Sequence, residues 1–93
     1  MGQTRRKEIE AQLILGPATA RDLSGEIGIS IDEVVGHLPH VRRSLRRGLR
    51  LRMEPSRCLA CDFELRSGKF KRPSRCPRCK SERLTEPTFW IEG

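Results

Sequence analysis

The four cysteines of this chain form two C-x-x-C pairs, Cys58 with Cys61 and Cys76 with Cys79, and residues 62–75 lie between the pairs. A C-x-x-C turn presents two sulfur atoms on one side of a tight knuckle, and the intervening residues allow a short hairpin to bring the knuckles together. This spacing predicts one tetrahedral zinc site, a zinc ribbon. Because all four ligands would come from the protein, no position stays open for water, and the single Zn²⁺ would be structural.

Other interpretations of the cysteines have weaker support. Two disulfides would need an oxidising compartment, and the chain passes from Met1 straight into an amphipathic pattern without a signal peptide. A thioredoxin-type redox pair needs a βαβ setting. Rubredoxin-like iron uses the same four thiolates, so iron stays open beside zinc. With no apolar run of membrane-spanning length, we expect a cytoplasmic protein without membrane association.

The positive charge is concentrated in one part of the sequence. The whole chain carries a net charge of +7, whereas residues 41–83 hold fifteen Lys and Arg against four acids, a net charge of +11. The remaining residues are net acidic. Such asymmetry indicates a polyanionic partner, and nucleic acid is the first to consider.

The N-terminal part predicts a helix-turn-helix. Residues 5–15 have apolar side chains at helical spacing, and Gly16 ends this first helix. Residues 20–27 predict a second helix, which Thr19 caps. The Gly28 that follows, with an apolar residue and a serine after it, is typical of the turn between the two helices of the motif.

Ser30 begins the third predicted helix, because Glu33 three residues later completes a capping box. Pro39 has no amide hydrogen, so we expect this helix to end or kink just before it, and a further short helix to follow over about residues 40–47. The motif and this extension together predict three or four helices.

The exposed face of the third helix is a poor match to a DNA-reading helix. Asp32 and Glu33 stand at its start, where a helix in the major groove needs Arg, Lys, Asn or Gln. His37 and His40 lie three residues apart, but no third metal ligand is near them in sequence. We therefore expect ordinary surface histidines.

Basic residues follow the third helix without any acid from residue 41 to residue 53. A solvated face usually mixes both signs, so this run suits contact with phosphates better. We call these residues the arginine stripe: Arg42, Arg43, Arg46, Arg47, Arg50 and Arg52. A second basic cluster between the cysteine pairs would extend the same footprint: Lys69, Lys71, Arg72 and Arg75.

Residues 49–53 alternate between apolar and basic side chains, which predicts a strand with one buried face. We expect it to pair with a final strand at residues 89–91. A hairpin with its turn at residues 67–68 would lie between the knuckles, with Phe70 packing back. The expected fold class is α+β, a winged helix-turn-helix with a zinc ribbon inserted at the wing.

The expected organisation has three parts. Residues 1–53 would form the helix-turn-helix and the first wing strand, and residues 54–87 the zinc ribbon. Residues 88–93 would form the final wing strand, which returns to the helical domain.

Five stretches resemble a known family: LSGEIGIS (23–30), SLRR (44–47), LRMEP (51–55), CLACDF (58–63) and KRPSRCPRCKSE (71–82). The family consists of small, mainly archaeal predicted transcriptional regulators that join a winged helix-turn-helix to a rubredoxin-like zinc ribbon. The resemblance covers nearly all residues from about 5 to 92. It implies zinc at the four cysteines, and DNA binding as an inferred role.

We expect a DNA-binding transcriptional regulator with a structural zinc site, which contacts duplex DNA through the arginine stripe. Two alternatives stay open: a protein-protein interaction module of the transcription apparatus, and RNA binding with Trp90 as a stacking platform. The sequence has no Gly-rich phosphate loop and no nucleophile-base pair, so we do not expect an enzyme. A monomer and a homodimer are both compatible with it.

Overall fold

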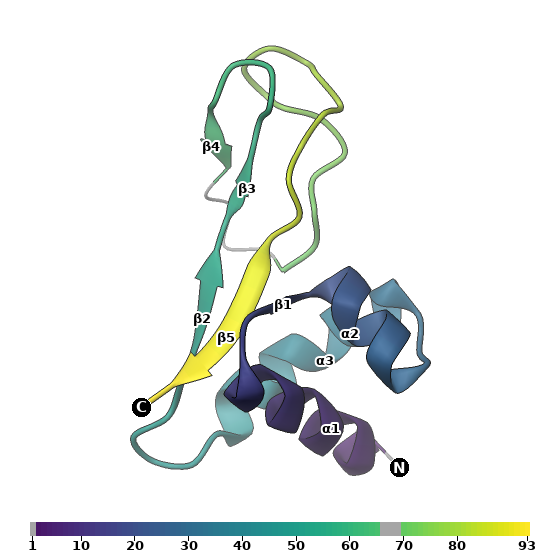
Figure 1. Cartoon of the computed structure of the whole chain (residues 1–93), viewed down its shortest axis with the longest axis vertical. Coiled ribbons are helices and arrows are strands. Elements are labelled where there is room, and N and C mark those ends of the chain that lie inside the picture. The colour runs from purple at the N-terminus through teal and green to yellow at the C-terminus, as the bar shows by residue number, and fades with distance from the viewer. Residues whose placement is uncertain (1, 66–69) are drawn as a thin grey trace.

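The computed structural model describes residues 2–65 and 70–93. Figure 1 shows three helices gathered at one end of the molecule, with the segment that contains the cysteines extending from the other end of a small sheet. The elements follow in the order α1 (Gly2–Leu15), β1 (Ala18–Thr19), α2 (Ala20–Ile27), α3 (Ile31–Ser44), β2 (Arg50–Glu54), β3 (Ser56–Arg57), β4 (Glu64–Leu65) and β5 (Thr88–Glu92). The chain is therefore a mixed α+β protein.

The turn between α2 and α3 forms as the sequence predicts. Thr19 caps α2, and the capping box is completed by Asp22, whose carboxylate accepts a hydrogen bond from the Thr19 amide at 3.0 Å. Gly28 ends α2 with a left-handed φ of 83°, and its amide donates to the Ser24 carbonyl at 2.9 Å. A side chain with a Cβ atom is strained at that φ, which explains the glycine.

The prediction that the third helix ends before Pro39, with a separate helix over residues 40–47, was wrong. Helix α3 continues through Pro39 to Ser44. Val34, Leu38 and Val41 lie on one face of α3 and are fully buried. Burial of each such side chain contributes about 1.5–3 kcal/mol, which together outweighs the cost of about 3 kcal/mol for an interior proline.

The Ser30–Glu33 capping box forms only in part. The Ser30 hydroxyl accepts a hydrogen bond from the Glu33 amide at 3.1 Å, as predicted. The Glu33 carboxylate, however, lies 3.8 Å from the ring nitrogen Nε2 of His37, one turn further along α3. Glu33 therefore faces the next turn of its own helix rather than the backbone that precedes it.

Strand β5 is the centre of a three-stranded antiparallel sheet with the order β1-β5-β2. The predicted pairing of the two longer strands is confirmed, with Leu51 opposite Ile91 and Met53 opposite Phe89. These residues belong to the hydrophobic core formed with the three helices. Strand β1 was not predicted, because two residues carry no detectable alternation.

The helical end and the cysteine-rich end have separate cores. The larger core lies between the helices and the sheet, and Phe70 packs against it with its ring centroid 5.9 Å from that of Phe89. The smaller core consists of Cys58, Leu65, Cys76 and Leu84, with Phe63 beside it. The predicted turn at residues 67–68 lies outside the described residues, and strand β4 pairs with β3.

We predict that Pro39→Ala stabilises the folded protein. The substitution restores one helical hydrogen bond and is worth up to about 3 kcal/mol in an ideal helix, whereas proline stiffens the unfolded chain by up to about 1 kcal/mol. The expected gain is about 1–2 kcal/mol in the free energy of unfolding, measured by denaturant titration of the zinc-loaded protein. His40→Ala, an exposed change on the same helix, should alter stability by less than about 0.5 kcal/mol. A loss of stability in Pro39→Ala would contradict this account of α3.

Candidate metal centre and arginine surface

The two cysteine pairs lie in knuckles that have the same backbone hydrogen bonds. In the first, the Asp62 amide donates to the Cys58 carbonyl at 2.9 Å, and in the second the Lys80 amide donates to the Cys76 carbonyl at 2.8 Å. Asp62 and Lys80 both have a left-handed φ, 65° and 67°. The polypeptide therefore forms the same turn twice, although neither position has the glycine that this conformation favours.

The four sulfur atoms form one cluster. All lie within 4.8 Å of one another, and this is the one group of at least three possible metal ligands in the described part of the chain. The Sγ atoms of Cys58 and Cys79 are 3.5 Å apart, and those of Cys61 and Cys76 are 3.7 Å apart. A Zn–S bond of about 2.3 Å in a tetrahedron places sulfurs about 3.8 Å apart. The cluster therefore fits one zinc ion, and the distances are far too long for disulfide bonds.

The first cysteine of each pair is buried and favours the thiolate. Burial raises the pKa of Cys58, but hydrogen bonds from the amides of Cys61 and Ala60 and from neighbouring thiols outweigh it and lower the pKa to about 6. In Cys76 burial also raises the pKa, but hydrogen bonds from donors that include the amides of Cys79 and Arg78 outweigh it and lower the pKa. These two positions are prepared to bind a metal cation.

The second cysteine of each pair is exposed and holds its proton more firmly. In Cys61 the amide of Phe63 lowers the pKa, but desolvation and the three neighbouring thiols raise it to about 12. In Cys79 the amide of Ser81 lowers the pKa, but effects that include the Cys58 thiol and burial outweigh it and raise the pKa above its ordinary value. A bound Zn²⁺ would remove this conflict by replacing the shared protons.

The knuckles also contact each other through a cation and an aromatic ring. The Arg78 guanidinium lies over the Phe63 ring, 5.7 Å from its centroid, and so joins the second knuckle to the first. Within the first knuckle, Arg57 lies 3.8 Å from the Asp62 carboxylate. Four thiolates around one divalent cation leave about two negative charges, which nearby cations offset.

The arginine stripe lies on two faces of the molecule. Arg50 and Arg52 are exposed on β2, on the face opposite to Leu51 and Met53, which pack toward the helices. The other four residues lie in the last turn of α3 or directly after it, and all are exposed: Arg42, Arg43, Arg46 and Arg47. The stripe therefore passes from the helical side of the molecule to the outer face of the sheet.

The second basic cluster has acidic partners within the molecule. Lys71 lies 3.5 Å from the carboxylate of Asp32, at the acidic start of α3. Arg72 and Arg75 lie 3.7 Å and 3.8 Å from carboxylates of the acidic residues that precede β5. Lys69, the remaining member, lies outside the described residues. The sequence does not reveal these pairings, because each partner is distant along the chain.

The fold and the four cysteines define a small α+β protein with a rubredoxin-like zinc ribbon. Residues 55–93 match the PF0610 rubredoxin-like zinc beta-ribbon domain, and residues 4–51 match the domain described as PF0610-like, N-terminal. The chain belongs to this PF0610-like family, and its four cysteines can hold one zinc ion.

The chain is similar to a protein whose structure has been solved. It shares 30% sequence identity and a TM-score of 0.81 with the solution NMR structure of protein PF0610 from Pyrococcus furiosus, over 98% of this chain and 90% of that one. A comparison with curated proteins gives no match. In the described part of the chain, no helix is both long and apolar enough to cross a membrane.

We predict that zinc affinity falls as the pH is lowered. Zinc binds thiolates, so every cysteine that is protonated in the metal-free protein releases a proton when zinc binds. We expect the metal-free ribbon to be unfolded, and an unperturbed cysteine has a pKa of about 8.5, so below that pH log affinity should fall by up to about four per pH unit. Competition with a chromophoric chelator measures this slope. An affinity that does not change with pH would contradict coordination by four thiolates.

We also predict that a chelator unfolds the ribbon before the helical end. Two of the four residues in the ribbon core are zinc ligands, whereas the larger core contains no cysteine. Amide hydrogen exchange should therefore accelerate at Cys58 and Cys76 and stay slow at Val34 and Leu38. Equal acceleration in both regions would mean that the two cores unfold as one unit.

Proposed function

We propose that this protein is a DNA-binding transcriptional regulator of the winged helix-turn-helix type. The order α1-β1-α2-α3-β2-β5 and the capped turn between α2 and α3 support this assignment. Strands β2 and β5 would form the wing, and the zinc ribbon would be an insertion between them. The bound zinc would stabilise this insertion and take no part in chemistry.

One observation carries the proposal. Among the described residues, five arginines of the stripe form no ion pair, whereas the Arg52 guanidinium lies 3.6 Å from the Glu92 carboxylate. The five are Arg42, Arg43, Arg46, Arg47 and Arg50. Exposed cations without acidic partners do not have to break an ion pair in order to reach a phosphate. They are therefore the surface that duplex DNA would contact first.

The contacts of Arg42 and Arg43 are compatible with phosphate binding. The Arg42 guanidinium stacks on the Phe70 ring at 5.5 Å, which occupies its face and leaves its N–H edge available. Arg43 lies 3.5 Å from the ring nitrogen Nδ1 of His40. Through Phe70, the ribbon segment would hold Arg42 in place, which gives the zinc site an indirect role in binding.

We do not propose that the start of α3 contacts DNA bases. Lys71 lies 3.5 Å from Asp32, and Glu33 faces His37 one turn along α3, so both acids there are directed toward other side chains of the protein itself. Binding would depend mainly on phosphates and would therefore have low sequence selectivity. The second basic cluster would contribute less than the arginine stripe, because each of its described members has an acid within 4 Å.

A protein-interaction module is the second candidate. Leu59, on the first knuckle, is 61% exposed, and Leu15 at the end of α1 is 82% exposed. Exposed apolar side chains of this size are common at docking surfaces. RNA binding by stacking on Trp90 has less support, since Trp90 is half-buried and its Nε1 donates to Glu92 at 2.8 Å. We propose no catalytic activity, because zinc at this site would have no open coordination position.

We predict that binding to random duplex DNA is steep in salt and depends on the arginines at the end of α3. Each phosphate contact contributes about −0.9 to the slope of log affinity against log salt concentration. Replacing Arg42, Arg43, Arg46 and Arg47 with alanine should therefore reduce the magnitude of the slope by up to about 3.6. Fluorescence anisotropy of the zinc-loaded protein measures both slopes.

The matched control removes four cations elsewhere, with alanine at the half-buried Arg5 and at the exposed Lys7, Arg21 and Arg83. It lowers the net charge by the same amount, so its slope should stay close to that of the original protein. Equal effects in both variants would contradict a localised DNA surface. Absence of binding at low salt would contradict the proposed function and favour the protein-interaction candidate.

A further inference from the structure

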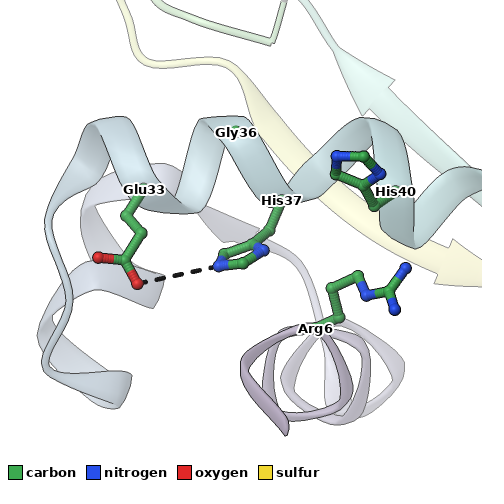
Figure 2. Close-up of a pocket in the computed structure, with 5 residues that line it drawn as sticks. All are labelled: Arg6, Glu33, Gly36, His37 and His40. Atoms are coloured by element: carbon green, nitrogen blue, oxygen red, sulfur yellow. Dashed lines mark ion pairs between the residues drawn. The ribbon is translucent and has the colours of Figure 1, made fainter. Parts of the chain in front are cut away.

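A pocket lies between α1 and the middle of α3, away from the cysteines. Its volume is about 480 Å³, and Figure 2 shows Arg6 reaching from α1 toward the side of α3 that carries the two histidines. The lining residues are Arg6, Glu33, Gly36, His37 and His40. This volume is within the range of about 300–1,000 Å³ that is usual for ligand pockets, and the pocket is open to solvent, because Glu33, Gly36 and His40 are exposed.

Gly36 keeps one wall of this pocket open. It lies in the interior of α3, where glycine is among the least favourable residues for helix stability. A Cβ atom added at Gly36 would have no heavy-atom neighbour within 4 Å, so nothing in the packing requires glycine there. Because Gly36 is one of the residues that line the pocket, a larger side chain here would occupy part of its volume.

The polar groups of the pocket are mainly hydrogen-bond donors. Arg6 forms no ion pair with any described residue, whereas its neighbour Arg5 pairs with Glu8 at 3.2 Å. His37 and His40 can each donate a ring N–H, in the neutral or the charged form. The one acid in the lining is Glu33, whose Oε2 lies 3.8 Å from His37 Nε2. That distance exceeds a hydrogen bond, so the His37 donor remains available to a ligand.

We propose that this pocket binds a small molecule through an anionic group, a carboxylate or a phosphate. The Arg6 guanidinium would form paired hydrogen bonds to two oxygens of the group, and His37 and His40 would donate to the remaining oxygens. The residues do not form a metal site, because the cysteines are the one metal-binding cluster in the described ranges 2–65 and 70–93. The body of the ligand would lie along the space beside Gly36.

This site is independent of the proposed DNA surface. None of the stripe arginines lines the pocket, and Arg43 approaches it only through its contact with His40. Anion binding in the pocket can therefore be measured without DNA, and DNA binding without the anion. A negative result for anion binding would leave the proposal of DNA binding standing, and the reverse also holds.

The test is an NMR titration of the zinc-loaded full chain, which follows the imidazole resonances of His37 and His40 and the amide of Gly36. Inorganic phosphate and citrate serve as the two probes, so that a phosphate preference and a carboxylate preference are distinguished. Saturable shifts at these positions with at least one probe are expected. No saturable shift with either probe would overturn the proposal.

Two variants examine the assigned roles, and each has a matched control. Arg6→Ala should weaken binding by about tenfold or more, the typical loss when a charged hydrogen-bond partner is removed, while Arg5→Ala should leave it unchanged. Gly36→Leu should abolish binding by filling the pocket, while Gly25→Leu, at an equally uncrowded helical glycine in α2, should not. Equal weakening by the two arginine variants, or full binding by Gly36→Leu in a spectrum that is otherwise native, would overturn it.

Discussion

The pairing of β5 with both β1 and β2 is the constraint on which the rest of the structure depends. This strand comes from the end of the sequence, yet it lies in the centre of the sheet and contributes Phe89 and Ile91 to the core under the helices. The segment between β2 and β5 is consequently an insertion that leaves the sheet and returns to it. This insertion has little apolar surface of its own, and its core includes two cysteines that a metal would cross-link.

Much of this architecture can be predicted from local sequence patterns. The helix boundaries around Thr19 and Gly28, the alternation of residues 49–53 and the spacing of the cysteines each report a structure that forms among near neighbours. The four-cysteine cluster follows from its spacing alone. What the patterns miss are effects of tertiary packing: α3 continues through Pro39 because buried side chains on both sides of it hold the helix together.

The charge pattern illustrates the same limit in the candidate site. Counting residues along the chain treats every cation between residues 41 and 83 as equally available for a polyanion. In the folded protein Lys71 lies against Asp32 and Arg72 against Glu86, so these cations of the second basic cluster already have acidic partners. The acidic start of α3, which is puzzling in a DNA-reading helix, becomes a contact between α3 and the ribbon. Only distances in the folded chain distinguish the second basic cluster, which has acidic partners, from the arginine stripe.

The repeated knuckle has a consequence for how metal would enter and leave. Because both turns have the same shape, each contributes one buried sulfur, from Cys58 or Cys76, and one exposed sulfur, from Cys61 or Cys79. A competing thiol arriving from solvent would meet the exposed pair first. Cys58 and Cys76, one from each half of the ribbon, would hold the ion on its buried side. The outer cysteines would control the rate of exchange, and the inner ones would control retention of the ion.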